Sequence, residues 1–179
     1  MKVRDGIQIA LLLAIGYILH FITPPLLFGM KPDTLLLMMF IALLLKGKDY
    51  KTVLATGLLG GILAAITSTF PGGQLPNIID KLLTASFAYL LIKTLPKTLP
   101  SIVTAEIVTI TGTLASGLFF LTAAALIVGL PGSFKALFIA VVIPAAVINA
   151  IAIAVLQPVV GLGHQMVTKS VSTVKEEQA

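Results

Sequence analysis

The chain has 179 residues, of which 58% are hydrophobic and 11% are charged, with a net charge of +5 at pH 7. A soluble domain carries about 25% charged residues, so this composition excludes an ordinary soluble domain and predicts a surface that faces lipid. The absence of cysteine excludes disulfides, zinc–thiolate sites and cysteine nucleophiles. The lysines fall between apolar runs, so membrane topology explains the positive charge better than nucleic-acid binding does.

Long apolar runs follow one another along the chain, separated by proline, glycine and lysine. In lipid every backbone polar group needs an internal partner, so each run is expected to be a helix. We therefore predict an all-α polytopic membrane protein, a six-transmembrane-helix bundle in a single membrane domain. The expected spans are 6–22, 33–45, 52–70, 75–93, 101–128 and 134–160. The second span is short, so it either begins nearer Gly29 or crosses a thinned bilayer.

The distribution of cations predicts the orientation of the bundle. Nine Lys or Arg residues lie at the chain ends and in the loops of one side, against Lys31 and Lys135 on the other, with Lys81 assigned to a span. Cationic residues are enriched on the cytoplasmic side, so both termini, including a short tail at 161–179, are expected in the cytoplasm. The alternative of a cleaved signal peptide over residues 1–22 lacks an A-x-A-like cleavage site and would spoil the even number of spans.

Enzyme motifs are absent from the sequence. It contains no H-E-x-x-H, no G-x-S-x-G and no G-x-x-x-x-G-K-[ST], so zinc proteolysis, serine hydrolysis and ATP binding lack their parts. His20 and His164 lie in different segments near opposite membrane faces. We therefore expect no catalytic residues, no metal site and no cofactor, and a protein that is not an enzyme.

Polar residues within or beside the spans are the candidates for function. Asn77, Asp80 and Lys81 open the fourth span, and an ionisable residue at that depth is costly unless it faces a cavity or a partner. Alternatively, Asp80 only caps the first helical turn and Lys81 reaches the headgroups. Asn149 needs a hydrogen-bond partner, which is either the substrate or a neighbouring helix. Glu106 either pairs with a lysine or serves as a proton or ion site.

Two loops on the predicted external side add further candidates. Segment 70–77 contains two prolines and two glycines, and its free N–H groups at a helix start favour a carboxylate ligand. Phe70, Gln74 and Asn77 of this segment are candidate contacts, although a plain connector between helices explains the pattern equally well. The loop from residue 23 to residue 33 carries Phe28 and Lys31, which suit a lid over a pocket. The alternative is that the apolar side chains of this loop dip into the membrane interface.

Taken together, the run 10–16 and the segments 28–33 and 70–81 resemble the bacterial tryptophan-transporter family. Proteins of that family are similar to the substrate-capture S components of energy-coupling factor (ECF) importers. The resemblance is specific over residues 1–95 and rests beyond them on length and hydropathy.

The resemblance implies a six-helix S component in a prokaryotic cell membrane that captures L-tryptophan, or a related aromatic compound, outside. Its partners would be a membrane-embedded T component and two cytoplasmic ATPase subunits. Ala10 and Ala14 match the A-x-x-x-A pattern through which S components contact the T component. Small residues at this spacing also pack inside many unrelated bundles.

If the ligand is tryptophan, the candidate residues have the following expected roles. Asp80 would receive its ammonium group, and Lys31, Lys81 or loop N–H groups would receive its carboxylate. Phe28 and Phe70 would stack on the indole.

Two other functions stay open from the sequence. A stand-alone secondary transporter of aromatic amino acids, driven by protons or sodium, would use Glu106 as its membrane carboxylate. A non-transporting membrane scaffold would bind no small molecule.

Overall fold

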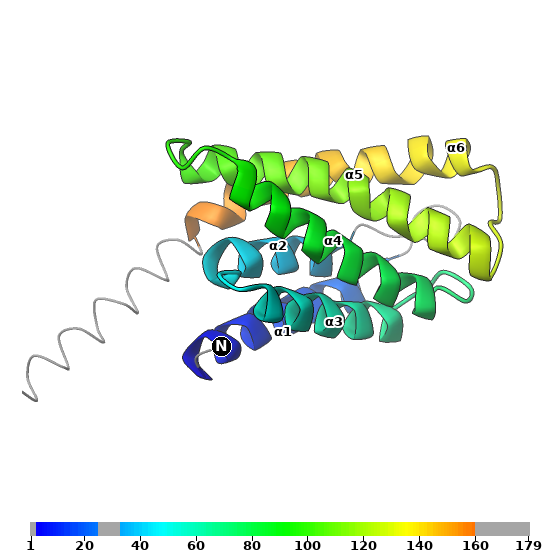
Figure 1. Ribbon diagram of the computed structural model, residues 1–179. Helices are drawn as coiled ribbons and strands as arrows, with labels where there is room; N and C mark the ends of the chain where they lie inside the picture. The colour runs from blue at the N-terminus through cyan, green and yellow to red at the C-terminus, as the bar shows by residue number, and fades with distance from the viewer. Residues whose placement is uncertain (1–2, 25–32, 160–179) are drawn as a thin grey trace, which may run out of the picture.

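The computed structural model describes residues 3–24 and 33–159, which form helices and connecting loops and contain no β-strand. The all-α prediction is therefore confirmed for this part of the chain. The sixth helix begins as the short α6, passes through a π-helical segment η1 and continues to Val159. The helices are α1 (Val3–Ile22), α2 (Thr34–Lys46), α3 (Tyr50–Ile66), α4 (Gln74–Thr94), α5 (Ser101–Ile127), α6 (Phe134–Leu137) and η1 (Phe138–Val142) (Figure 1).

Helix length and exposed surface both fit a membrane bundle. Four helices are long and apolar enough to cross a membrane: α1, α4, α5 and the sixth helix, whereas α2 and α3 are shorter. Large apolar side chains are exposed along α1 and the sixth helix, where a soluble protein would place polar residues. Examples are Leu11, Ile18, Phe21, Ile151 and Val155.

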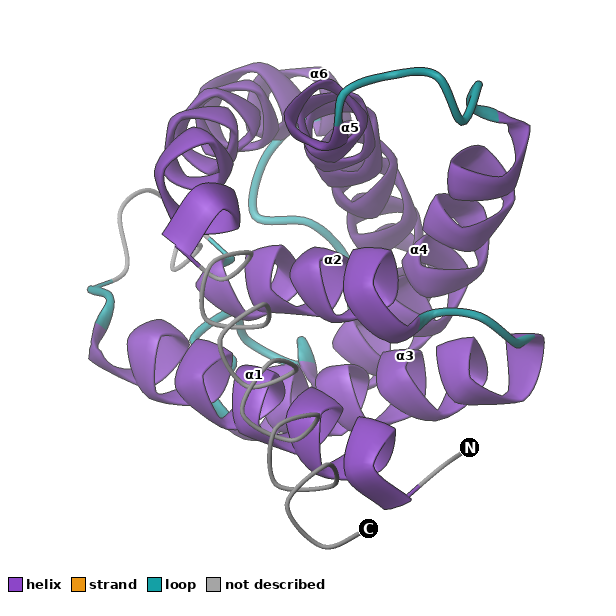
Figure 2. Ribbon diagram, turned by 90° about the vertical axis from the view of Figure 1, so that its left-hand side faces the viewer, coloured by secondary structure: helices purple, strands orange, loops and turns teal. Residues whose placement is uncertain are grey.

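Helix α2 is the centre of the bundle. Every residue from 35 to 43 is buried, and the neighbouring helices surround α2 on all sides (Figure 2). A helix that is apolar around its whole circumference has no polar face to turn to solvent. It packs against α1, α3, α4 and α5, and against Ile153 of the sixth helix. The short second run is therefore an internal helix, covered by protein instead of lipid.

Helices α3 and α4 approach each other closely because α3 carries glycine at the contact. A Cβ on Gly57 would lie 2.8 Å from the Cβ of Ala85, and a Cβ on Gly61 would lie 2.8 Å from the Cα of Ile78. Helix α3 ends at Ile66, earlier than the apolar run; Thr67 is its C-cap, and the Thr67 hydroxyl donates a hydrogen bond to the carbonyl of Leu63. The chain from residue 67 to residue 73 then turns into α4.

The two ends of the bundle differ. One end, called the pocket end below, holds the last turn of α1, the start of α2 and the α3–α4 and α5–α6 connections (Figure 1). The opposite end holds the start of α1 and the α2–α3 and α4–α5 connections. At that opposite end Lys46 lies 3.2 Å from Asp5, which ties α2 to α1.

Candidate binding pocket

A pocket lies among the helices at the pocket end. It encloses about 630 Å³ of empty space when its open mouth is included. Its lining comes from α1, α2, α4, α5 and the sixth helix, and from the α3–α4 connection. The lining residues are His20, Asp33, Leu36, Ser68, Thr69, Phe70, Asn77, Asp80, Lys81, Thr113, Ser116, Gly117, Phe120, Val141, Val142 and Ala145.

Asp33 joins three helices at this pocket. As the N-cap of α2, its Oδ1 accepts a hydrogen bond from the N–H of Leu36 at 2.8 Å. The same oxygen lies 3.2 Å from Nδ1 of His20, in the last turn of α1. Its Oδ2 lies 2.6 Å from Nζ of Lys81 on α4. The carboxylate that starts α2 is thus also the point where α1 and α4 are attached.

Asp80 and Lys81 are adjacent on α4, and each is only 1% exposed. Nζ of Lys81 lies 2.5 Å from Oδ2 of Asp80, and this oxygen also accepts a hydrogen bond from Ser116 at 2.9 Å. Oδ1 of Asp80 accepts from Thr84 at 2.8 Å. Since α4 already begins at Gln74, Asp80 lies too deep to cap it. Lys81 is buried in an ion pair and does not reach the headgroups, so the alternative of a cap and a surface lysine is wrong.

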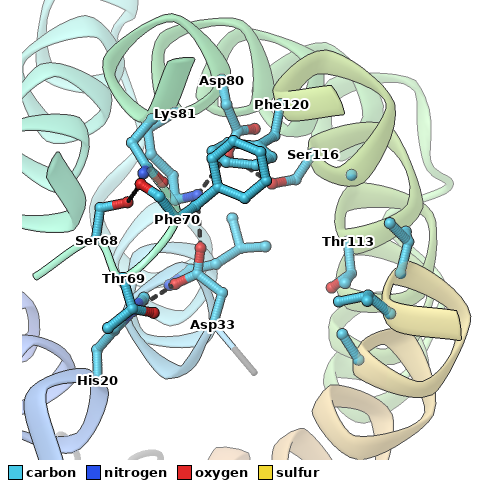
Figure 3. Close-up of a pocket in the computed structure, with 16 residues that line it drawn as sticks. His20, Asp33, Ser68, Thr69, Phe70, Asp80, Lys81, Thr113, Ser116 and Phe120 are labelled. Carbon is cyan, nitrogen blue, oxygen red and sulfur yellow. Dashed lines mark hydrogen bonds and ion pairs between the residues drawn. The ribbon is translucent and has the colours of Figure 1, made fainter. Parts of the chain in front are cut away.

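These residues form one side of the pocket, the charged wall, defined as His20, Asp33, Asp80, Lys81 and Ser116 (Figure 3). Two carboxylates face one ammonium group across ion pairs of 2.6 and 2.5 Å. The wall therefore contains two carboxylates and one lysine, beside the imidazole of His20. Buried charges persist only where they are paired and hydrogen-bonded, and two carboxylates that share one lysine make this wall suited to a cationic group.

A second group of lining residues, called the aromatic wall below, is defined as Phe70, Phe120, Val141, Val142 and Ala145. The rings of Phe70 and Phe120 meet edge to face, with their centroids 5.4 Å apart and their planes at 84°. This is a favoured geometry for an aromatic pair. The aromatic wall thus offers two rings and aliphatic side chains to a flat apolar ligand.

The position of this wall depends on Gly117 and on the π-helical segment. A Cβ on Gly117 would lie 2.2 Å from Cγ1 of Val142, so only glycine lets the sixth helix approach α5 this closely. Val141 and Val142 both belong to η1, and π-helical turns are frequent at functional sites. The missing side chain therefore sets the width of the pocket between α5 and the sixth helix.

A buried polar pair lies between the same two helices. Nδ2 of Asn149 donates a hydrogen bond to Oγ1 of Thr113 at 3.1 Å. Thr113 lines the pocket, whereas Asn149 lies behind it. Thr113 lies across the pocket from His20 and Asp33 (Figure 3). Asn149 therefore ties two helices together through a residue that itself faces the cavity.

Comparison with known proteins matches the sequence of this chain to one family. The family described as tryptophan transporter TrpP matches residues 2–163. The chain belongs to the tryptophan transporter family. It is 52% identical over 151 residues to a probable tryptophan transport protein of Clostridium acetobutylicum, covering 84% of this chain and 88% of the relative. It is 47% identical over 160 residues to one of Bacillus subtilis, covering 89% and 92%. No solved structure matches the chain.

Membership of this family confirms the resemblance found in the sequence. It also confirms that the chain is a transport protein and not an enzyme. Among residues 3–24 and 33–159, no group of three or more His, Asp or Glu side chains is arranged to hold a metal ion.

The pocket of this family member brings together half of the candidate binding residues. Phe70, Asn77, Asp80 and Lys81 line it. The side-chain amide of Asn77 donates to the carbonyl of Gly73 at 2.7 Å, so it braces the start of α4.

The other candidates lie elsewhere. Gln74 is exposed at the start of α4 and is not among the lining residues. Phe28 and Lys31 lie outside the described residues, so their roles stay predictions. Ala10 and Ala14 are exposed on α1 and do not pack inside the bundle.

Several lining residues were not among the sequence candidates. Thr113, Ser116 and Phe120 are spaced so that they fall on one face of α5. Hydroxyl residues are common in membrane helices, so this spacing is weak as a signal on its own. His20 looked like an interfacial side chain at a helix end, but it is buried beside Asp33.

Proposed function

We propose that this chain binds L-tryptophan in the pocket and acts as the substrate-binding S component of an ECF importer. In this proposal it captures tryptophan on the extracellular side for ATP-driven uptake through a T component and two ATPase subunits. The observation that supports this proposal is a pocket with both a charged wall and an aromatic wall, in a chain of the tryptophan transporter family. Tryptophan needs both, because it is a zwitterion with a large flat apolar body.

The charged wall has hydrogen-bonding capacity left for a zwitterion. A carboxylate has about four acceptor sites and a lysine has three donors. Asp33 accepts from His20, Leu36 and Lys81, which leaves it a site for the substrate ammonium. Asp80 is equally placed, since Lys81, Ser116 and Thr84 leave it a site as well.

Lys81 has the complementary role in this proposal. It uses two donors on Asp33 and Asp80, so its third donor is assigned to the substrate carboxylate. Compared with the expectation from sequence, Asp80 and Lys81 act through a shared network and not as two separate contacts. The indole then packs against Phe70 and Phe120 of the aromatic wall.

The lysine distribution supports capture from outside. Lys135 lies in the first turn of the sixth helix, at the pocket end. Five lysines lie at the opposite end: Lys46, Lys48, Lys51, Lys93 and Lys97. Cationic residues favour the cytoplasmic side. The pocket is therefore assigned to the outer face of the cell membrane, and both termini to the cytoplasm.

The outward face of α1 supports a partner in the membrane. Ala10 and Ala14 are exposed beside Leu11 and Ile18, so α1 presents a flat apolar strip that small residues keep smooth. Small residues let helix backbones approach closely in lipid. This strip is assigned to the T component, and the absence of an ATP-binding motif in the chain fits an ATPase supplied by other subunits.

A fluorescence titration tests the binding step. The chain contains no tryptophan, so all indole emission comes from the ligand. Purified protein is expected to bind L-tryptophan, and Asp80→Asn is expected to weaken that binding. Unchanged affinity in Asp80→Asn would remove the proposed role of the charged wall. Absence of binding by the unaltered protein would remove the capture function and favour a scaffold.

Proteoliposomes test the transport mechanism. Reconstituted with its T component and ATPases, the chain is expected to import tryptophan only when ATP is present on the ATPase side. Uptake by the chain alone, abolished by an uncoupler, would overturn the S-component proposal. Competition with phenylalanine, tyrosine and indole tests whether tryptophan is the preferred ligand.

One observation favours a second candidate, a proton- or sodium-coupled transporter that works alone. Glu106 lies half-buried in α5 and makes no ion pair with any residue in 3–24 or 33–159, contrary to the expected lysine partner. A membrane carboxylate without a cation is a typical ion-coupling group. Glu106 does not line the pocket, so Glu106→Gln is expected to abolish uptake in the second candidate and to leave tryptophan binding unchanged in both.

A further inference from the structure

Thr113 differs from most hydroxyl residues in this bundle in how its hydroxyl is used. Thr56, Thr67 and Thr111 each donate their hydroxyl to a backbone carbonyl one turn earlier in their own helix. Within the described part of the chain, Thr113 makes a single hydrogen bond, with Asn149 on the sixth helix at 3.1 Å. Its hydroxyl is therefore turned across the helix interface and is not tied to its own backbone.

The hydroxyl of Thr113 keeps an unused acceptor position. A hydroxyl oxygen has two lone pairs and one proton. When the amide of Asn149 donates, one lone pair is used and one remains. When the amide is turned so that its oxygen accepts the Thr113 proton, both lone pairs remain. In either orientation Thr113, which is 4% exposed and lines the pocket, offers an acceptor to a bound molecule.

The other hydroxyl groups of the pocket have different positions and partners. Ser116 donates to Asp80 on the charged wall, and Ser68 donates to the carbonyl of Phe70. Thr113 lies across the pocket from His20 and Asp33, on the α5 face that meets the sixth helix (Figure 3). A ligand whose charged end lies on the charged wall therefore extends its side chain towards Thr113.

We infer that Thr113, held by Asn149, accepts the indole N–H of the substrate and is the residue that distinguishes indole from other aromatic side chains. This inference rests on the proposed function and adds the basis of its specificity. Packing against rings and aliphatic groups distinguishes weakly among aromatic amino acids, whereas a buried acceptor rejects a ligand that lacks the matching donor. Asn149 has a positioning role, because it touches Thr113 and does not line the pocket.

The test compares tryptophan with 3-(benzothiophen-3-yl)alanine, in which sulfur replaces the indole N–H in a ring system of similar shape. Binding of both is measured by calorimetry on the purified full chain in detergent. The unaltered protein is expected to bind tryptophan about tenfold to a hundredfold more tightly, as loss of a buried hydrogen bond predicts. Thr113→Val is expected to bring the two affinities within about threefold, mainly by weakening tryptophan binding.

Two further variants separate this role from a general effect on packing. Thr113→Ser keeps the hydroxyl and is expected to keep the preference for tryptophan. Thr109→Val is the matched control, because Thr109 lies one turn away on α5, is fully buried with an unpartnered hydroxyl and does not line the pocket. It is expected to leave both affinities unchanged.

The outcomes distinguish the inference from the proposed function. Equal binding of the two ligands by the unaltered protein overturns the inference, and this result does not depend on any variant folding. A preference that survives in Thr113→Val also overturns it, while tryptophan capture stands. If the unaltered protein binds neither ligand, the proposed function fails, and the inference fails with it.

Discussion

The two walls of the pocket are built on different principles. The charged wall is a network in which the carboxylates of Asp33 and Asp80 each form an ion pair with Nζ of Lys81, at 2.6 and 2.5 Å. The aromatic wall contains no charge and depends on close approach, with Val142 packed into the space that Gly117 leaves. The charged wall therefore holds α1, α2, α4 and α5 together as well as lining the pocket, whereas the aromatic wall chiefly sets the width of the pocket.

If the charged wall holds the helices together, Lys81→Met has the largest expected effect of the pocket substitutions, and the effect is on the stability of the fold. Removing the ammonium leaves the buried carboxylate of Asp80 and the partly buried carboxylate of Asp33 without a cation, a change that typically costs about 3–5 kcal/mol. We expect a large fall in the melting temperature in detergent and no tryptophan binding. Lys93→Met is the control, because Lys93 is an exposed lysine of the same helix, over the ring of Tyr89. A melting temperature of Lys81→Met equal to that of the control would contradict the network.

Asp33→Asn is expected to act on binding more than on folding. Asparagine caps a helix about as well as aspartate, but the substitution removes one of the two carboxylates of the charged wall. A hydrogen bond to a charged group is worth roughly 1.5–3 kcal/mol, so tryptophan affinity should fall by about tenfold or more. The fluorescence titration described above measures this loss of tryptophan affinity.

Asp49→Asn is the matched control for this prediction. Asp49 caps α3 through the N–H of Thr52 at 2.9 Å, as Asp33 caps α2, but it lies at the opposite end of the bundle. Hydrogen bonds from Thr52 hold the pKa of the Asp49 carboxyl below its usual range, so Asp49→Asn also removes a charge. Equal losses of affinity in the two variants would mean that the effect of Asp33→Asn is not local.

Gly117→Ala tests whether packing sets the aromatic wall. Its Cβ would lie 2.2 Å from Cγ1 of Val142, so the sixth helix has to shift. Overpacking of this kind costs about 1–3 kcal/mol, and both the melting temperature and tryptophan affinity should fall. Gly132→Ala, whose Cβ would meet no atom within 4 Å, should change neither. An unaltered tryptophan affinity in Gly117→Ala would show that the contact between Gly117 and Val142 does not set the width of the pocket.

Phe120→Leu has the smallest expected effect. It keeps an apolar side chain and removes one ring of a pair whose geometry contributes about 0.5–1.5 kcal/mol. We expect tryptophan affinity to fall a few-fold while stability is nearly maintained. Phe21→Leu, on the exposed face of α1, serves as the comparison, and a similar change in both variants would argue against a contact between Phe120 and the indole.

Much of the fold could be predicted from the sequence, because apolar runs in lipid have few alternatives to helices. The charged wall was half predictable for a related reason. Asp80 and Lys81 are conspicuous within an apolar run, whereas His20 and Asp33 stand at helix ends where many roles are possible.

The aromatic wall was much harder to predict. Phe120 and Thr113 are ordinary residues for a membrane helix, and they become notable only when α5 meets the sixth helix. The central position of α2 was likewise hidden, because a short apolar helix can be buried by protein or by lipid. These features arise from contacts between distant segments, which one sequence does not reveal.

The burial of α2 has a consequence for how the protein responds to its membrane. A bilayer that thickens or thins acts on helices it touches, by tilting or compressing them. Helix α2 is covered along residues 35–43, so such forces reach it only through its neighbours. Its N-cap, Asp33, lines the pocket, and its last residue, Lys46, lies beside Asp5. The start of α2, which lines the pocket, is thus shielded from direct contact with lipid. We expect this part of the pocket to keep its shape in membranes of different composition.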